Sequence, residues 1–230
     1  YFFGKTASVV SNINILKKEI KNYKHHNLDI RNKSKIEKIF EKYKKNIKFI
    51  LHCAAQPSHD WAAREPFTDF LINALGTLNI LESVRKYSPN AKLVHMSTNK
   101  VYGDRPNLLP LKEQKRRYEI SKQHKYFQNG IDETMSIDDS KHSLFGASKL
   151  AADIYCQEYW KYFGLKIGIF RGCCLTGSLH QGAELHGFLS YLIKAAKEGK
   201  KYSIFGYKGK QVRDNIHSED VVDAIWEFYK

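Results

Sequence analysis

The stretches KFILHCA (residues 48–54) and KLVHMS (residues 92–97) decide the fold class. Both are apolar without the alternation of a half-exposed strand, which is typical of strands buried on both faces of a parallel sheet. A third stretch of this kind, Lys166–Phe170, follows further along the chain. Parallel strands need long crossover connections, which helices usually provide. The three stretches therefore predict an α/β protein with a doubly wound parallel sheet.

Helix signals fill the segments between and around these strands. Ser34 has the side chain of an N-cap, and Glu37 three residues later completes a capping box. Pro89 and Gly164 mark the ends of two further helices. The predicted helices are Ser34–Lys44, Glu65–Tyr87, His142–Phe163, Glu184–Lys197 and Ser218–Tyr229, and the remaining predicted strands are Tyr23–Ile30, Tyr202–Phe205 and Val212–His217. Alternation of this kind places helices on both faces of the sheet.

Polar or small residues stand where three of the predicted strands end. Asp29 closes the first strand, the run 54–56 follows the second, and the run 97–99 follows the third. Ligands of doubly wound sheets bind at the carboxyl ends of the strands. The sequence therefore predicts a nucleotide site at this edge. The polar stretch 99–141 beyond it contains no predicted element, and long loops of this kind usually carry function.

Composition excludes several classes of protein. The chain has 230 residues, of which 42% are hydrophobic and 13% aromatic, so it is not a disordered chain. No run of 18 apolar residues occurs, and no membrane partner is expected. The four cysteines, two of them adjacent at Cys173-Cys174, form neither a disulfide framework nor a C-x-x-C zinc pair. We therefore expect a cytoplasmic protein without a metal site.

The net charge of +14 raises the question of nucleic acid. Residues 17–48 contain 12 Lys and Arg against 4 Asp and Glu. The whole chain, however, has 30 Lys and only 8 Arg, whereas proteins that read base edges favour Arg. No helix-turn-helix, zinc-finger or aromatic RNA-binding pattern is present. A solvated, lysine-rich helix surface is the favoured interpretation, and no nucleic-acid partner is expected.

Four short motifs occur in a fixed order along the chain. They are HCAAQ at 52–56, N-x-x-G-T at 73–77, STNKVYG at 97–103 and RDNIHSED at 213–220. Each motif alone is a weak signal, but their order and spacing together are specific. The set resembles the extended short-chain dehydrogenase/reductase superfamily, which contains sugar-nucleotide epimerases and dehydratases. Within it, the runs 97–104 and 209–214 are most similar to the CDP-paratose (CDP-tyvelose) 2-epimerases.

The resemblance implies a Rossmann-like fold and a division of the chain. Residues 1–170 would form an NAD-binding domain that is incomplete at the N-terminus, and residues 171–230 the beginning of a small, partial substrate lobe. The glycine-rich turn that holds the cofactor's pyrophosphate in this superfamily is missing, because the only early glycine is Gly4. We therefore expect the chain to be the middle of a longer protein, which binds NAD and forms a homo-oligomer.

The resemblance also implies roles for individual residues. Asp29 would contact the adenine, Lys149 the nicotinamide ribose, and Arg213 the substrate diphosphate. The implied NAD-binding residues are Asp29, Ile30, Ala54, Ala55, Gln56, Asn73, Ser97 and Lys149; the catalytic positions are Thr98, Lys149 and Phe145; and the substrate-binding residues are Thr98, Asn99, Thr176, His186 and Arg213. The implied substrate is a nucleotide sugar, a CDP-hexose, which is oxidised at C2 by NAD and reduced again on the opposite face of the 2-keto sugar.

Two departures from the superfamily pattern bear on the reaction. The superfamily's base is a tyrosine four residues before Lys149, and here that position is Phe145. Either another group transfers the proton, or the sugar chemistry differs, or the protein is a catalytically impaired binder of NAD and nucleotide sugar. The second departure is Asn99-Lys100, where the 4,6-dehydratases of the superfamily carry Asp-Glu. This pair argues against a dehydratase.

Overall fold

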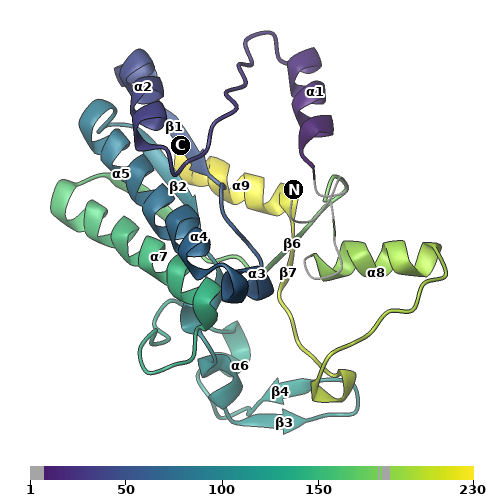
Figure 1. The fold of residues 1–230 in the computed structure, drawn as a ribbon. Coiled ribbons are helices and arrows are strands. Elements are labelled where there is room, and N and C mark those ends of the chain that lie inside the picture. The colour runs from purple at the N-terminus through teal and green to yellow at the C-terminus, as the bar shows by residue number, and fades with distance from the viewer. Residues whose placement is uncertain (1–7, 181, 183–186) are drawn as a thin grey trace.

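The computed structural model describes residues 8–180, 182 and 187–230 (Figure 1). Its main helices are α1 (Val10–Glu19), α2 (Lys33–Tyr43), α3 (His59–Arg64), α4 (Pro66–Phe70), α5 (Gly76–Tyr87), α6 (Tyr126–Asn129), α7 (Ser143–Phe163), α8 (Phe188–Lys197) and α9 (Ser218–Tyr229). The strands are β1 (Phe49–His52), β2 (Lys92–Met96), β3 (Leu111–Glu113), β4 (Tyr118–Ile120), β5 (Lys166–Phe170), β6 (Cys174–Thr176) and β7 (Asn215–His217). No helix within the described ranges is long and apolar enough to cross a membrane.

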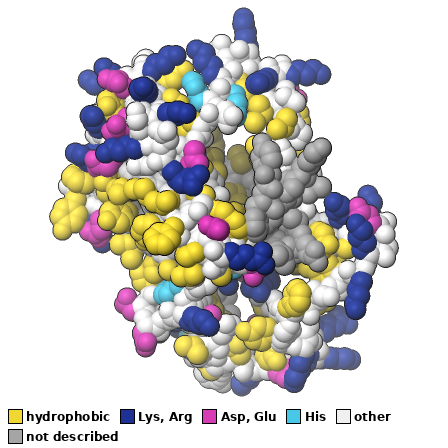
Figure 2. Space-filling view, viewed as in Figure 1, with side chains coloured by type: hydrophobic (Ala, Val, Ile, Leu, Met, Phe, Trp, Pro, Cys, Tyr) yellow, Lys and Arg dark blue, Asp and Glu magenta, His cyan; other side chains and the backbone are white. Residues whose placement is uncertain are grey.

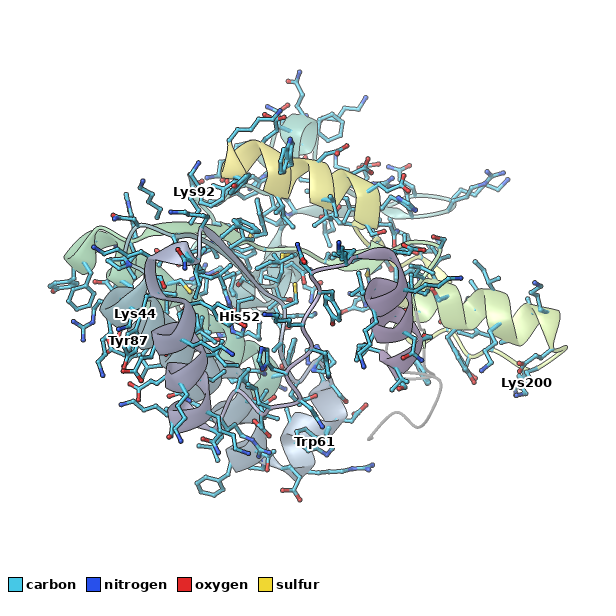
Figure 3. All side chains as sticks on the ribbon, turned by 90° about the horizontal axis from the view of Figure 1, so that it is seen from above. Lys44, His52, Trp61, Tyr87, Lys92 and Lys200 are labelled. Atoms are coloured by element: carbon cyan, nitrogen blue, oxygen red, sulfur yellow. The ribbon has the colours of Figure 1, made fainter. Side chains whose placement is uncertain are left out.

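The central sheet has the order β1-β2-β5, and both of its strand pairs are parallel. Helices α2, α5 and α7 cover one face and α9 lies on the other (Figure 1). The last residue of α9 is bonded to the sheet, because Lys92 Nζ on β2 donates a 2.6 Å hydrogen bond to the Tyr229 carbonyl (Figure 3). Phe49 and Tyr229 stack edge to face with ring centroids 5.3 Å apart. Helices on both faces of a parallel sheet confirm the doubly wound α/β prediction.

The main core lies between the sheet and its three-helix face. It consists of Ile36, Phe40, Ile80, Leu81, Val84, Leu93, Cys156, Tyr159 and Leu165. Ile36 and Phe40 stand one turn apart on α2, so the apolar stripe of that helix faces the core while its lysines face water. The basic segment at 17–48 is therefore largely a solvated surface, as the sequence indicated.

Several helix and strand predictions hold to within a few residues. β5 and α9 have the predicted bounds, and β1 and β2 are slightly shorter than predicted. The predicted helix Glu65–Tyr87 is α4 and α5, joined by a π-helical turn over Leu71–Leu75. The first residues predicted for the helix at 184–197 lie outside the described residues, and α8 begins at Phe188.

Three local predictions are wrong. Residues 23–30 and 202–205 are not strands. At the end of the first segment, the Asn79 side chain donates a 2.9 Å hydrogen bond to the Ile30 carbonyl and so occupies an acceptor that a neighbouring strand would use. The N-cap of α2 is Asn32, whose side chain accepts from the Lys35 N–H at 3.1 Å, and Ser34 lies inside the helix.

The polar stretch 99–141 is more ordered than the sequence indicates. It contains the antiparallel hairpin β3–β4 and the short helix α6. A second cluster of buried residues holds this stretch together: Val101, Tyr102, Tyr126 and Met135. The predicted strand Val212–His217 is shorter in the structure, where it is β7 (Asn215–His217), and the sequence predicts neither its parallel partner β6 nor the helices α1 and α3. The predicted boundary between two domains at residue 170 stays a prediction. Helix α9, which belongs to the predicted second domain, packs on the sheet of the first.

Candidate active site

The carboxyl ends of β1 and β2 lie side by side, because His52 and His95 are paired in the parallel register. After β1, Ala54 and Ala55 are exposed. After β2, Ser97, Thr98 and Asn99 are half-buried. The sheet thus brings these two predicted groups of site residues to one edge, where ligands of such sheets bind.

A buried network fixes the loop that carries the two alanines. Asn73, in the π-helical turn, pairs with the Gln56 backbone: its Oδ1 accepts from Gln56 N at 2.8 Å and its Nδ2 donates to the Gln56 carbonyl at 3.1 Å. The Gln56 side chain donates to Asp69 at 2.6 Å, and Asn73 also donates to Ser148 on α7 at 3.0 Å. The buried side chains of Gln56 and Asn73 therefore fix the loop on its protein side, and the small side chains of Ala54 and Ala55 remain exposed to solvent.

Thr98 stands between the sheet and a short 3-10 turn over Asn99–Tyr102. Its Oγ1 caps this turn by accepting from the Lys100 N–H at 3.3 Å. The Asn99 N–H donates to the Gly172 carbonyl at 2.9 Å, which ties the turn to the segment after β5. The hydroxyl of Thr98 is thus fixed at the end of β2.

Lys149 reaches this position from helix α7. Its side chain is buried, and Nζ donates a 2.8 Å hydrogen bond to the Met96 carbonyl, two residues before Thr98. Burial lowers the pKa of Lys149 to about 8, so the ammonium form still predominates at neutral pH. Burial of His52 and His95, together with the positive charge of Lys149, lowers their pKa values, that of His52 to about 4. The charged ammonium group of Lys149 therefore lies near two uncharged imidazoles, those of His52 and His95.

Sequence reasoning missed a buried ion pair beneath Thr98. Asp153, one turn after Lys149 on α7, is fully buried and accepts from Ser97 Oγ at 2.6 Å. Arg171, just after β5, forks onto both carboxylate oxygens at 2.9 and 3.1 Å and donates to the Tyr102 hydroxyl at 2.9 Å. The Asp153 carboxylate raises the pKa of Arg171. The only sequence signal was the spacing of four between Lys149 and Asp153, which puts both on one helix face.

Phe145 is buried one turn before Lys149, as the spacing predicts. Its ring meets the imidazole of His59, at the start of α3, edge to face with centroids 4.8 Å apart. Nδ1 of His59 lies 2.9 Å from Oγ of Ser143. Sequence reasoning did not select His59, and no spacing could have, because 84 residues separate it from Ser143.

The remaining predicted site residues lie away from this centre or outside the described residues. The Asp29 carboxylate is forked by Arg31, whose hydrogen bonds lower its pKa. Thr176 ends β6, and Arg213 lies in an exposed loop, where it donates to Gln211 at 2.7 Å. Ile30 packs against Gly76, and His186 is outside the described residues. In the part of the chain that the structure describes, no three His, Cys, Asp or Glu side chains form a metal cluster.

Comparison with known proteins settles the family. A model of the NAD dependent epimerase/dehydratase family matches residues 5–230. The chain belongs to this family. The family is NAD-dependent, which confirms NAD as the predicted cofactor. The Rossmann-like prediction is confirmed as well, since solved structures of this family share the fold.

Two curated relatives illustrate the similarity of this family member to known enzymes. CDP-paratose 2-epimerase of Salmonella typhi is 36% identical over 86% of this chain and 57% of its own length. A putative UDP-glucose 4-epimerase of Methanocaldococcus jannaschii is 31% identical over 86% of this chain and 56% of its own. The chain therefore spans a little over half the length of these two relatives.

Two solved structures show the same similarity in three dimensions. Pal from Bacillus thuringiensis superposes with a TM-score of 0.76 at 23% identity, over 95% of this chain and 61% of that one. UDP-glucose 4-epimerase of Thermus thermophilus, solved as a complex with NAD, superposes with a TM-score of 0.66 at 26% identity, over 87% and 58%.

The residues of this family member fit a dinucleotide. The exposed alanines after β1 leave the backbone open to close approach, and Lys149 places a cation within the same edge. Asp29 presents a carboxylate that is half-exposed despite its pair with Arg31. Lys149 would hold the cofactor's ribose, the alanine loop its phosphates, and Asp29 its adenine.

Proposed function

We propose that the whole protein is an NAD-dependent nucleotide-sugar epimerase that inverts C2 of a CDP-deoxyhexose through a 2-keto sugar. The observation that carries this proposal is the hydrogen bond from Lys149 Nζ to the Met96 carbonyl, which brings Lys149 to the end of β2, two residues before Thr98. The 36% identity to a CDP-paratose 2-epimerase supports the choice of sugar and base.

Each group has a chemical task in this proposal. NAD, when bound, supplies a hydride acceptor that can give the hydride back. The Thr98 hydroxyl hydrogen-bonds the sugar oxygen at C2, and Lys149 stabilises negative charge that develops on that oxygen. Arg213 binds the substrate diphosphate, and its position in an exposed loop leaves its guanidinium available to an anion. Thr176, at the end of β6, would contribute to the sugar and base pocket.

The residues after Thr98 favour epimerisation over dehydration. Several relatives are named dTDP-glucose 4,6-dehydratase, among them one from Salmonella typhimurium at 27% identity. Elimination of water needs an acid to protonate the leaving hydroxyl and a base to take a proton from carbon. Asn99 has no acidic proton at neutral pH, and Lys100 offers no carboxylate. This site therefore lacks both groups at the places where Asp and Glu would stand.

Phe145 motivates the second candidate function. A phenyl ring cannot take a proton, and a positioned acid–base group is commonly worth about 10²–10⁴ in rate. A protein with no replacement for it would bind NAD and a nucleotide sugar without interconverting them.

The exposed hydrophobic side chains of α4 and α7 support a homo-oligomer. Phe67 and Phe70 on α4, and Tyr155 and Phe163 on α7, are all exposed. Figure 2 shows hydrophobic side chains gathered over this side of the molecule. Since α4 packs against α7, they form one surface, which a second copy would cover. Light scattering of the full-length protein should give a dimer or larger, and Tyr155→Lys should shift it towards monomer; a concentration-independent monomer would contradict this part of the proposal.

The reaction is tested by incubating the full-length protein with NAD and CDP-paratose and following C2 inversion by NMR. UDP-glucose and dTDP-glucose serve as competing substrates for 4-epimerisation and dehydration. We expect inversion of CDP-paratose only, and its loss in Thr98→Val, which keeps the side-chain shape without the hydroxyl. Turnover of dTDP-glucose to a 4-keto product would overturn the assignment. NAD and nucleotide-sugar binding without any turnover would support the second candidate. The expected cytoplasmic location is tested separately, by looking for the activity in the cytoplasmic fraction of cells.

A further inference from the structure

Phe145 lies against an imidazole, a group that can transfer the proton that a phenyl ring cannot. Its ring edge packs against the imidazole of His59 at a centroid distance of 4.8 Å and an interplanar angle of 66°. His59 is the first residue of α3, which packs against α7. This contact holds the imidazole against the ring that stands where the family has its tyrosine.

The hydroxyl of Ser143 lies next to that imidazole. Its Oγ is 2.9 Å from His59 Nδ1 and accepts a 3.2 Å hydrogen bond from the Gly146 N–H. Because one lone pair of Oγ is occupied by Gly146, the Ser143 hydroxyl hydrogen can be directed at Nδ1 of a neutral His59. Histidine and serine in hydrogen-bond contact form a route along which a proton can move.

The backbone at Ser143 is strained in a way that an ordinary helix start does not require. Its φ is +62°, in the left-handed region that non-glycine residues avoid. Backbone strain of this kind clusters at active sites. The preceding residue, His142, fixes the strained turn by a 2.9 Å contact from Nε2 to the Val101 carbonyl. Val101 lies in the turn that Thr98 caps, so Ser143 and Thr98 are tied to the same corner of the molecule.

We propose that His59, acting through Ser143, performs the proton transfer that Phe145 cannot. This inference rests on the proposed C2 epimerisation. As the C2 hydrogen and its electron pair pass to the nicotinamide cofactor, the C2 hydroxyl gives its proton to Ser143 Oγ, and the Ser143 proton passes to His59 Nδ1, which becomes an imidazolium. When the ketone is reduced on its other face, the proton returns by the same route, so that no proton or electron is gained or lost. Phe145 is then the apolar wall that orients the imidazole.

Four variants of the full-length protein test this relay. His59→Gln removes the proton acceptor but keeps a polar side chain. Ser143→Gly removes the hydroxyl without adding strain, because glycine adopts positive φ readily. Phe145→Tyr restores a hydroxyl at the family's usual position, alone and together with His59→Gln. His25→Gln is the matched control, since His25 is an exposed histidine far along the chain from this corner.

We expect His59→Gln and Ser143→Gly to lower kcat by about 10²–10⁴-fold with little change in KM, and the added Phe145→Tyr to recover a large part of the loss in His59→Gln. His25→Gln should match the wild type. A second readout does not depend on turnover: in the protein without substrate, Ser143→Gly should shift the ¹⁵N NMR resonance of His59 Nδ1, because that nitrogen loses its hydrogen-bond partner.

The outcomes separate this inference from the function on which it rests. An active wild type whose His59→Gln variant keeps its kcat would overturn the relay and leave the epimerase proposal standing. So would an unmoved Nδ1 resonance in Ser143→Gly. A wild type that does not invert CDP-paratose, including one that becomes active only with Phe145→Tyr, would overturn the epimerase proposal and the relay together.

Discussion

Asp153 joins three segments of the site, and its replacement by Asn tests how that site is held together. The carboxylate is fully buried and binds Ser97 at the end of β2, Arg171 after β5 and Gln157 on its own helix. Asp153→Asn keeps the volume and removes the negative charge. The Arg171 guanidinium, only 15% exposed as a side chain, would then have no carboxylate partner at this position.

The magnitude follows from burial. Removing one partner of a buried ion pair typically costs about 3–5 kcal/mol, because the other charge stays desolvated. Two features place the expected loss near the lower end, about 3 kcal/mol: Arg171 keeps its bond to the Tyr102 hydroxyl, and the Asn amide oxygen can still accept one hydrogen bond. A loss of this size is a large fraction of the roughly 5–15 kcal/mol typical of whole domains.

The assay is urea unfolding followed by far-UV circular dichroism, with the free energy of unfolding compared among three variants. Glu158→Gln breaks an exposed pair with Lys161 on the same helix and should cost less than about 1 kcal/mol. Replacing both Asp153 and Arg171 by Leu should cost less than Asp153→Asn alone, because no buried charge is left unpaired. A loss for Asp153→Asn no greater than that for Glu158→Gln would refute the reasoning.

Three further predictions concern pH, packing and the cofactor. The pKa of His52 is about 4 in the folded chain and about 6.5 in the unfolded chain, so the unfolded chain binds this proton first as the pH falls. The free energy of unfolding should therefore fall by about 2 kcal/mol between pH 7 and pH 5 on account of His52. Urea unfolding of His52→Gln at both pH values should show a decrease that is smaller by this amount. Gly76→Ala would put a methyl group 2.5 Å from Cδ1 of Ile30, so we expect a net loss of about 1 kcal/mol in thermal unfolding, and a stabilised variant would contradict the packing described here. Asp29→Asn should weaken NAD binding to the full-length protein by about 10-fold or more in calorimetry, whereas unchanged affinity would leave Asp29 without the proposed role.

The elements that the sequence predicts well have local causes. β5 and α9 match their predicted bounds, because an apolar run and a capped amphipathic stretch are complete signals within a few residues. The cap of α2 shows the limit of such signals. Asn32 and Ser34 are both good N-cap residues, and the buried positions Ile36 and Phe40 agree with either start.

Strand prediction fails where a partner decides the outcome. Residues 23–30 pair with no strand of the described residues, and the carbonyl at the end of this segment, that of Ile30, accepts from the Asn79 side chain instead. The hairpin β3–β4 has only three residues in each strand, too few for a readable pattern. A strand needs a neighbour, and a single sequence does not say which segment that neighbour is.

The residues of the candidate site also fall into two groups, those that the sequence predicts and those that it does not. Thr98 and Lys149 belong to motifs, and the motifs place them correctly at one edge of the sheet. His59 and Ser143 are 84 residues apart in the sequence, so no spacing rule pairs them, and only the helical spacing of Asp153 from Lys149 pointed towards the pair of Asp153 with Arg171. Motifs therefore predict which residues meet the cofactor, whereas the groups that position them or could replace Phe145 emerge only from the packed structure.

The fate of the C2 hydrogen tests the central claim most directly. CDP-paratose carrying deuterium at C2 should be converted by the full-length protein and NAD into the C2 epimer with the deuterium still at C2, because the hydride is taken up and returned within one site. Mass spectrometry and NMR of the product measure that retention. Replacement of the deuterium by hydrogen from solvent would contradict the account, since it would mean that C2 loses a proton instead of a hydride.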